Sequence, residues 1–526
     1  MDSIKKYVVA VDIGSSEVTI AVGTMVEGGV INIETVVREP IAGGVTAGLI
    51  DNSQTVAEAL RKARERAEDE VGIAITDAYV TISGKFVRCA RYTDHVFVED
   101  KDNCIAHRDL AALRERMCNV KATEGETIMD FFPLCYKSDI GTELKNPVGC
   151  YSKQLSATYN FILCDNTSKD RLRRVFLEVG IKIRETFAGA AIVADSLVTS
   201  DEKEDGVAIV DIGSGVTDVA IYRGGVLCYI ASIPMGGSAI NADILAYNKN
   251  IPSKTVENIK RKCGSAVVEL TPDDMIKVVR TQGRPIKPIP RLNLAAVIEA
   301  RMTDIVEYVW AEIREAGYGK RLGAGIVLTG GVANLKNVAE LFHRKTEQEV
   351  RVACAEIGIT TESLEKVAAT ESTLAVSLLL RGASIGPCPV GHLLRQKPVV
   401  EPQPEPQPEP AVPPVTPPAQ QTVTPQPTVT PTPAVQTPVQ QPVQQPVQQP
   451  VQQPAAQPEQ QPVAQPTVPP VQQSISQEGI EDDIEDEDIK PKRSFFGGWG
   501  IGRKLKEAIS NAFPEPGEEL DADDDY

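Results

Sequence analysis

The sequence has few of the residues on which metal centres, disulfide frameworks and base-stacking surfaces depend. Only 5% of its 526 residues are aromatic, and it contains four histidines and ten cysteines. The cysteines show no Cys-x-x-Cys spacing and the histidines form no cluster, which argues against a zinc site and against a disulfide framework. Scattered cysteines of this kind indicate a protein of a reducing compartment.

Long apolar runs and basic stripes are also missing. No segment has the length of a membrane span, and Lys5 and Lys6 lead into a short β-type run with Asp12 rather than into a secretory signal. The first 390 residues contain no cluster of basic and aromatic residues, so no nucleic acid partner is expected. Any membrane contact is therefore expected to be peripheral.

The net charge of −18 is concentrated near the C-terminus. Eight acidic residues lie within 478–488 and seven within 515–525, so the rest of the chain is closer to neutral. Residues 398–473 are almost entirely Pro, Gln, Val, Thr and Glu, with repeated Val-Gln-Gln-Pro units. This composition cannot bury a core and predicts a disordered, polyproline-rich linker.

A repeated motif is the most informative feature that is present. Val-Ala-Val-Asp-Ile-Gly-Ser-Ser, ending at Ser16, returns about two hundred residues later as Ile-Val-Asp-Ile-Gly-Ser-Gly. In each copy a β-type run leads to an aspartate, Asp12 or Asp211, then to a small-residue turn and a second β-type run. Such turns let backbone N–H groups approach an anion closely, and a carboxylate beside phosphate is favourable when Mg²⁺ and its waters lie between them. The repeat predicts a duplicated domain closing around one ligand; two ordinary Asp-Gly turns are the alternative.

Two further glycine-rich elements follow the second copy. A strand over 325–328 runs into Gly330 and Gly331 and then a helix start, where a flat backbone and the helix dipole favour a purine or a phosphate. The turn at 234–237 precedes two helices, over 238–247 and 253–263, and the second carries Glu257 and Lys260 one turn apart. Taken alone, the double glycine is more often a plain turn and the ion pair a solvated one.

The remaining pattern predicts a helix over 53–67, an α+β module inserted from Lys85 to about Cys164, a helix over 169–179, a strand over 181–186 and a small-residue helix over 188–197. Within the module we expect strands at 92–98, 128–136 and 156–164 and a helix at 107–120. The small-residue helix suits close packing against another element, at the junction of the two halves.

The three glycine-rich elements, in this order and over residues 1 to about 385, resemble the superfamily of actin, sugar kinases and heat-shock chaperone ATPases. Within it the chain is similar to the FtsA family, because the module after Ser83-Gly84-Lys85 stands where that family carries its 1C subdomain. Met235 to Ser238 with Asp243, the Phe187-Ala188-Gly189 segment and the amphipathic C-terminus agree with this.

The resemblance implies an α/β, actin-like (ribonuclease-H-like) duplicated fold. It places subdomain 1A at 1–84 and 167–205, 1C at 85–166, 2A and 2B at 206–390, a disordered linker at 391–489, a membrane-targeting segment at 490–514 and an acidic disordered tail at 515–526.

The same resemblance implies ATP and Mg²⁺ as ligands. Asp12 and Asp211 would hold Mg²⁺ through water, and the other implied contacts are Gly14, Ser15, Ser16, Gly213, Ser214, Gly215, Thr217, Gly236, Gly237, Glu257, Lys260, Gly330, Gly331 and Asn334. Glu185 stands near the place of a water-positioning glutamate, although a structural surface carboxylate is the commoner use of such a residue. Glu17 occupies a position where lysine is common, so weak hydrolysis is expected.

The C-terminal segment has helical apolar spacing beside basic residues. The predicted membrane contacts are Phe495, Phe496, Trp499, Ile501, Arg503, Lys504, Leu505, Lys506, Ile509 and Phe513. An anionic surface would bury the apolar stripe and attract the basic groups, while the acidic tail would weaken the attraction. A helix docked on the globular body or on a partner protein is the alternative.

These features together predict an ATP-binding, actin-like division protein. By resemblance it would self-associate into filaments and act with other division proteins, tying the tubulin-like ring protein FtsZ to the cytoplasmic face of the inner membrane at the division site. A pilus-assembly actin homologue, a small-molecule kinase of the same superfamily and a chaperone-like ATPase are the competing interpretations. Neither kinase nor chaperone chemistry explains the linker and the amphipathic end.

Overall fold

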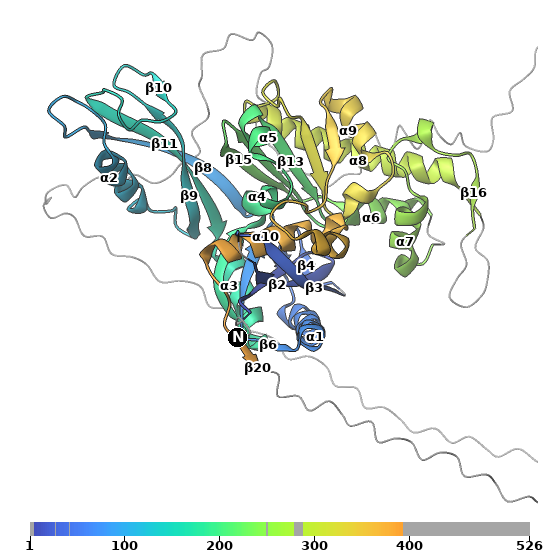
Figure 1. The fold of residues 1–526 in the computed structure, drawn as a ribbon. Coiled ribbons are helices and arrows are strands. Elements are labelled where there is room, and N and C mark those ends of the chain that lie inside the picture. Colours follow the sequence, from blue (N-terminus) through green and yellow to red (C-terminus); the bar gives the residue numbers. More distant parts are fainter. Residues whose placement is uncertain (1–4, 27, 42, 249–250, 278–287, 393–526) are drawn as a thin grey trace, which may run out of the picture. The chain divides into compact units, whose positions relative to one another are not determined.

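The computed structural model describes residues 5–26, 28–41, 43–248, 251–277 and 288–392, all within one compact unit (Figure 1). The predicted linker and membrane-targeting segment lie outside the described residues.

The first half is built on a five-stranded sheet of order β12-β7-β1-β2-β3. Its strands are β1 (Tyr7–Ile13), β2 (Glu17–Met25), β3 (Ile31–Pro40), β7 (Asp77–Ile82) and β12 (Lys182–Ala188). The first three form an antiparallel meander, and β7 and β12 continue the sheet parallel to β1. Val8 to Val11 are fully buried because helices cover the sheet on its faces, which is why β1 reads as a continuous apolar run.

Helix α1 (Ser53–Val71) shows how the sequence positions these covering helices. Asn52 caps its first turn through its side-chain oxygen, and Gly72 ends it in the left-handed conformation. Val56, Leu60 and Ala63 repeat at three- to four-residue spacing and face β2 and β3. Helix α3 (Asn166–Val179) packs beside it, and α10 (Thr373–Ile385) packs against β1 and β2.

The second half repeats this arrangement. Its sheet has the order β15-β14-β13-β18-β19, built from β13 (Val207–Ile212), β14 (Thr217–Arg223), β15 (Val226–Ile233), β18 (Ile326–Thr329) and β19 (Val350–Val352). An antiparallel meander is again extended by two parallel strands. The helices of this half are α6 (Gly237–Tyr247), α7 (Ser253–Cys263), α8 (Arg291–Glu315) and α9 (Val338–Thr346). The predicted duplication is therefore confirmed, since both sheets have the same strand order and directions.

The inserted segment forms a separate small sheet of order β10-β9-β11-β8 with one helix. Its elements are β8 (Val87–Phe97), α2 (His107–Cys118), β9 (Glu126–Lys137), β10 (Glu143–Leu144) and β11 (Gln154–Asp165). Leu113 and Met117 of α2 pack with Phe161 in its own core. Strand β8 begins five residues earlier than the sequence predicts, because its ladder with β11 extends to Val87.

The small-residue segment after β12 is not the single helix that was predicted. It forms α4 (Gly189–Ile192), the 3-10 turn η1 (Val193–Ser196) and then α5 (Ser200–Asp205). The Ser377 hydroxyl donates to the Val193 carbonyl, and the Tyr222 hydroxyl donates to the Ala191 carbonyl, each at 3.0 Å. These hydroxyls of α10 and β14 bond to carbonyls that a continuing α-helix would use. The segment therefore changes from α-helix to the tighter 3-10 helix between the two halves.

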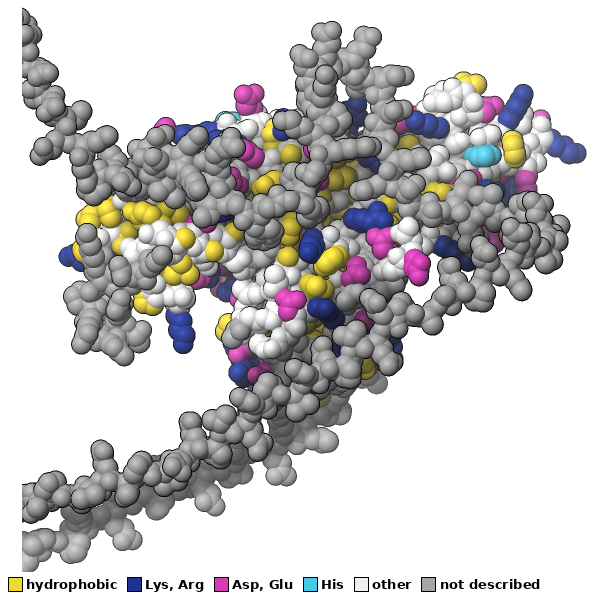
Figure 2. All heavy atoms as spheres, turned by 180° about the vertical axis from the view of Figure 1, so that it is seen from behind, with side chains coloured by type: hydrophobic (Ala, Val, Ile, Leu, Met, Phe, Trp, Pro, Cys, Tyr) yellow, Lys and Arg dark blue, Asp and Glu magenta, His cyan; other side chains and the backbone are white. Residues whose placement is uncertain are grey.

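Short elements complete the described chain: β4 (Val45–Thr46), β5 (Leu49–Ile50), β6 (Ile73–Ile75), η2 (Val268–Leu270), β16 (Met275–Ile276), β17 (Ile289–Pro290), η3 (Gly331–Asn334), η4 (Thr361–Val367), η5 (Thr370–Ser372) and β20 (Val390–His392). Within these residues no helix combines the length and apolar character that crossing a membrane requires. Figure 2 shows basic and acidic side chains interspersed over the described surface of one face.

Candidate functional site

The two Asp-Ile-Gly turns face each other. We call residues 12–17, between β1 and β2, loop 1, and residues 211–217, between β13 and β14, loop 2. The turns are built alike, because Gly14 N–H donates to Glu17 O at 3.0 Å and Gly213 N–H to Val216 O at 2.9 Å. A Cβ placed on Gly215 would clash with the Ser15 hydroxyl, so the loops approach to van der Waals contact. The fold thus brings both predicted phosphate loops to one place.

The carboxylates of Asp12, Asp211 and Asp218 lie close enough at these loops to influence one another. Burial raises the pKa of Asp211 to about 8, with smaller increases from the charges of Asp218 and Asp12. Burial also raises the pKa of Asp12 to about 6, although a hydrogen bond from Thr81 opposes it. Asp218 has a raised pKa for the same reason, partly offset by a hydrogen bond from Ser232. Asp12 and Asp211 are half-buried residues.

This arrangement suits a cation held indirectly. No three histidine, cysteine, aspartate or glutamate side chains converge tightly enough to ligate a metal directly anywhere in the described ranges. Asp12 and Asp211 nevertheless repel each other in a low-dielectric setting, and a divalent cation would relieve that repulsion. Mg²⁺ commonly keeps several waters and takes only one or two carboxylates together with substrate phosphates. The donor set therefore fits Mg²⁺ brought with a nucleotide.

The turn before α6 lies directly on loop 2. Gly237 N–H donates to Gly213 O at 3.0 Å, and Ser238 N–H donates to Ser214 O at 2.8 Å. Thr217 is fully buried and its hydroxyl donates to Met235 O at 2.8 Å. Thr217, predicted as part of phosphate loop 2, therefore uses its hydroxyl to fix the turn before α6.

The loop after β18 closes over Asp211. Gly330 has φ +85°, and a Cβ there would clash with Asp211 Oδ1. Thr370 donates to Gly330 O at 2.7 Å and accepts from Asn334 Nδ2 at 2.7 Å. Asn334, which the sequence predicts as a contact of the nucleoside and nearby phosphates, fastens this loop to η5 through its amide nitrogen.

The pair on α7 also reaches the glycine turn. Lys260 Nζ lies 2.7 Å from Glu257 Oε2 and donates to Gly237 O at 3.2 Å. Burial lowers the pKa of Lys260, and the Glu257 carboxylate opposes that shift. Asn241, which the sequence did not single out, donates to Glu257 Oε2 at 2.7 Å, while its own buried Oδ1 finds no hydrogen-bond partner among the described residues. An unsatisfied acceptor at this point suits a ligand donor such as a ribose hydroxyl or an amine.

Glu185 does not join this cluster. It is exposed on β12 and lines a different cavity of about 430 Å³, together with Asp195, Tyr222 and Arg381. None of the residues of loop 1 or loop 2 lines that cavity. The position does not fit the water-positioning role predicted for Glu185.

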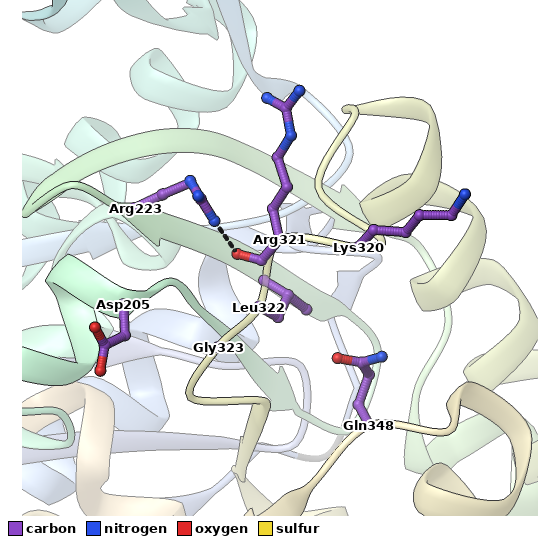
Figure 3. Close-up of a pocket in the computed structure, with 7 residues that line it drawn as sticks. All are labelled: Asp205, Arg223, Lys320, Arg321, Leu322, Gly323 and Gln348. Carbon is purple, nitrogen blue, oxygen red and sulfur yellow. Dashed lines mark hydrogen bonds between the residues drawn. The ribbon is translucent and has the colours of Figure 1, made fainter. Parts of the chain in front are cut away.

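A second, smaller cavity lies apart from the predicted site (Figure 3). It has a volume of about 250 Å³ and is lined by Asp205, Arg223, Lys320, Arg321, Leu322, Gly323 and Gln348. The Arg223 guanidinium donates to Arg321 O at 2.7 Å. This smaller cavity shares no residue with loop 1, loop 2 or the turn at 234–237.

Comparison with known proteins gives a consistent result. The family described as "Cell division protein FtsA" matches residues 208–377. The chain is 30% identical over 364 residues to cell division protein FtsA of Escherichia coli (strain K12), covering 68% of this chain and 86% of the relative. It is 29% identical over 346 residues to that of Bacillus subtilis (strain 168), covering 66% and 78%. A solved PilM-PilN type IV pilus biogenesis complex aligns with TM-score 0.47 and 15% identity, over 71% of this chain and 98% of that one. From its sequence similarity over most of the globular region, this chain belongs to the FtsA family of cell division proteins and has its actin-like fold.

Proposed function

We propose that this protein binds one Mg-ATP between its two halves. The observation that carries the proposal is the apposition of loop 1 and loop 2 over Asp12 and Asp211. The backbone N–H groups of the loops would hold the phosphates, and the two aspartates would hold the waters of the Mg²⁺ ion. The remaining contacts, to the nucleoside and nearby phosphates, would come from Gly236, Gly237, Glu257, Lys260, Gly330 and Gly331.

Titration of the full chain with a fluorescent ATP analogue tests this directly. Because the aspartates act through the cation, replacing Mg²⁺ by excess EDTA should weaken binding by about tenfold or more. Equal affinity with and without Mg²⁺ would argue against a role for Asp12 and Asp211. No binding in either condition would remove the proposal altogether.

Hydrolysis is expected to be slow. Glu17 places a carboxylate at the end of loop 1, where a cation would assist phosphate chemistry. Glu185, the predicted water-positioning residue, lies at another cavity. The chain would therefore use ATP mainly to set the closure of its halves, and closure would favour filament contacts.

The cellular role proposed here follows from membership of the family. The protein would polymerise, bind FtsZ and other division proteins, and hold the FtsZ ring at the cytoplasmic face of the inner membrane. Residues 495–513 would supply the peripheral membrane contact. One short amphipathic helix binds weakly and reversibly, so a filament that presents many such helices would bind far more tightly through effective concentration.

Membrane attachment should depend on this segment and on ATP. Deleting residues 494–513 should abolish co-sedimentation with vesicles of phosphatidylcholine and phosphatidylglycerol, while the intact chain should sediment more with ATP than with ADP. Deleting residues 515–526 instead should increase binding, since the acidic tail is repelled by anionic lipid. Undiminished sedimentation of the 494–513 deletion would show that another surface binds the vesicles.

A further inference from the structure

A chain of ion pairs runs beside the candidate nucleotide site. Arg38 on β3 lies 3.7 Å from Glu17 in loop 1 and 3.8 Å from Glu371 on η5. The same Glu371 oxygen also pairs with Arg261 on α7. We call Arg38, Glu371 and Arg261 the cleft latch.

We propose that Glu371 is a positioning residue for the nucleotide, because its ion pairs with Arg38 and Arg261 hold the two halves together beside loop 1 and slow the release of bound ATP. This inference rests on the nucleotide binding proposed above.

The latch joins elements of both halves. Arg38 belongs to the meander of the first sheet, where it stands opposite Thr19 on β2. Arg261 belongs to α7 of the second half and directly follows Lys260, which contacts the glycine turn. Glu371 is the carboxylate shared between them, so opening the halves would separate at least one of the two pairs.

The segment that carries Glu371 is hydrogen-bonded to both halves. Its neighbour Thr370 donates to the carbonyl of Gly330, which lies against Asp211. The preceding segment is tied to β3, since Lys366 Nζ donates to Ile33 O at 2.7 Å and Ile33 N–H donates to Ser363 Oγ at 2.8 Å. Glu371 is also a close neighbour of Gly331, because a Cβ placed on Gly331 would lie 3.4 Å from the Glu371 side chain. A shift of the loop after β18, which contains Gly330 and Gly331, would therefore move Glu371 when nucleotide leaves.

The latch also controls charge at the phosphate loop. Burial raises the pKa of Glu17, Arg38 lowers it and Glu371 raises it again. With Arg38 beside Glu17, the negative charge that this loop carries is partly neutralised where phosphates would lie. The side chain of Glu371 is only 10% exposed, whereas those of Arg38 and Arg261 are 36% and 50% exposed, so solvent screens the two ion pairs from the arginine side only.

The test measures nucleotide release from the full chain. A fluorescent ATP analogue is bound in Mg²⁺ and displaced by excess ATP in a stopped-flow instrument, for the wild type, Glu371→Gln, Arg261→Gln and the double variant. Glu371→Gln should speed release about threefold to tenfold, and adding Arg261→Gln should change it no further, because that partner is already lost. Arg38→Gln should also speed release. Arg344→Gln, which removes an ion-paired arginine on α9, should release like the wild type.

Each outcome decides between a latch and a merely structural carboxylate. If all four single variants unfold at the same temperature without nucleotide while only those of the latch release faster, the proposal stands. Unchanged release from Glu371→Gln in a protein that binds the analogue would overturn it, as would fully multiplicative effects of Glu371→Gln and Arg261→Gln. A wild type that binds no analogue would instead refute the proposed nucleotide binding, and the latch with it.

Discussion

Replacing Asp211 by asparagine should abolish tight Mg-ATP binding and, at the same time, stabilise the nucleotide-free protein. Burial and the charges of Asp218 and Asp12 raise the pKa of Asp211 to about 8, so its ionised form is unfavourable until a cation arrives. Asparagine keeps the shape and removes the charge. We expect the affinity for Mg-ATP to fall by about 100-fold, and the free energy of unfolding at pH 8 to rise by roughly 1 to 3 kcal/mol.

The stability that Asp211→Asn adds should depend on pH, because the pKa of Asp211 differs between the folded and unfolded protein. The pKa of Asp211 is higher in the folded protein than its ordinary value of 3.8, so the folded state holds this proton more tightly than the unfolded chain does. Its contribution to stability is complete below about pH 4 and is lost as the pH rises towards 8. The stability advantage of Asp211→Asn should therefore be small at pH 5 and grow towards pH 8.

Urea unfolding at the two pH values, with nucleotide titration of each variant, measures both effects. Asp273→Asn is the matched control, because Asp273 is exposed and outside the candidate site, and it should change neither quantity. Normal Mg-ATP affinity in Asp211→Asn would contradict the assigned role. A loss of stability at pH 8 would show that the charged carboxylate has a favourable partner in the nucleotide-free protein.

The loops could be predicted from sequence because their signals are local. In each half the apolar run, the aspartate and the small-residue turn are contiguous, so the meeting of Asp12 and Asp211 followed from the duplication alone. Asp218 was missed although it follows Thr217 in the second motif; its counterpart on β2 is Thr19, so the repeat did not mark the position. The cleft latch could not be foreseen, because Arg38, Arg261 and Glu371 are brought together from distant parts of the chain.

Glu185 lies on a strand, where an approximate alignment is a weak guide to the direction of a side chain. Successive strand residues point to opposite faces, so a displacement of one position moves a side chain to the other side of the sheet. The pairing of β12 with β7 has a register irregularity between Ile183 and Glu185, which no local pattern announces. The helix expected over 188–197 failed for a related reason, because the hydroxyls of Ser377 and Tyr222 that tighten it come from other elements.

Replacing Gly330 by alanine should damage both stability and the nucleotide site. Its φ of +85° is unfavourable for any residue with a Cβ, and that Cβ would meet the Asp211 carboxylate and lie 2.7 Å from Ile212 O. Either the loop after β18 or Asp211 must shift. For a residue with a Cβ, this positive φ combined with a ψ of 173° costs about 1 to 3 kcal/mol. We expect the clash to add about 1 to 3 kcal/mol and to weaken Mg-ATP binding by about tenfold or more, because Asp211 is displaced.

Gly317→Ala separates the clash from the strain. Gly317 has φ +84°, nearly that of Gly330, but a Cβ there meets nothing within 4 Å. Both variants should be less stable in urea unfolding because a Cβ is unfavourable at positive φ. Only Gly330→Ala should also lose the stability that the clash removes and the nucleotide affinity. If Gly330→Ala and Gly317→Ala lose the same stability and both still bind nucleotide, the loop after β18 supports the fold without shaping the site. A selective loss of binding in Gly330→Ala would tie that loop to Asp211, since both positions have a positive φ but only Gly330 brings the new methyl group against the Asp211 carboxylate.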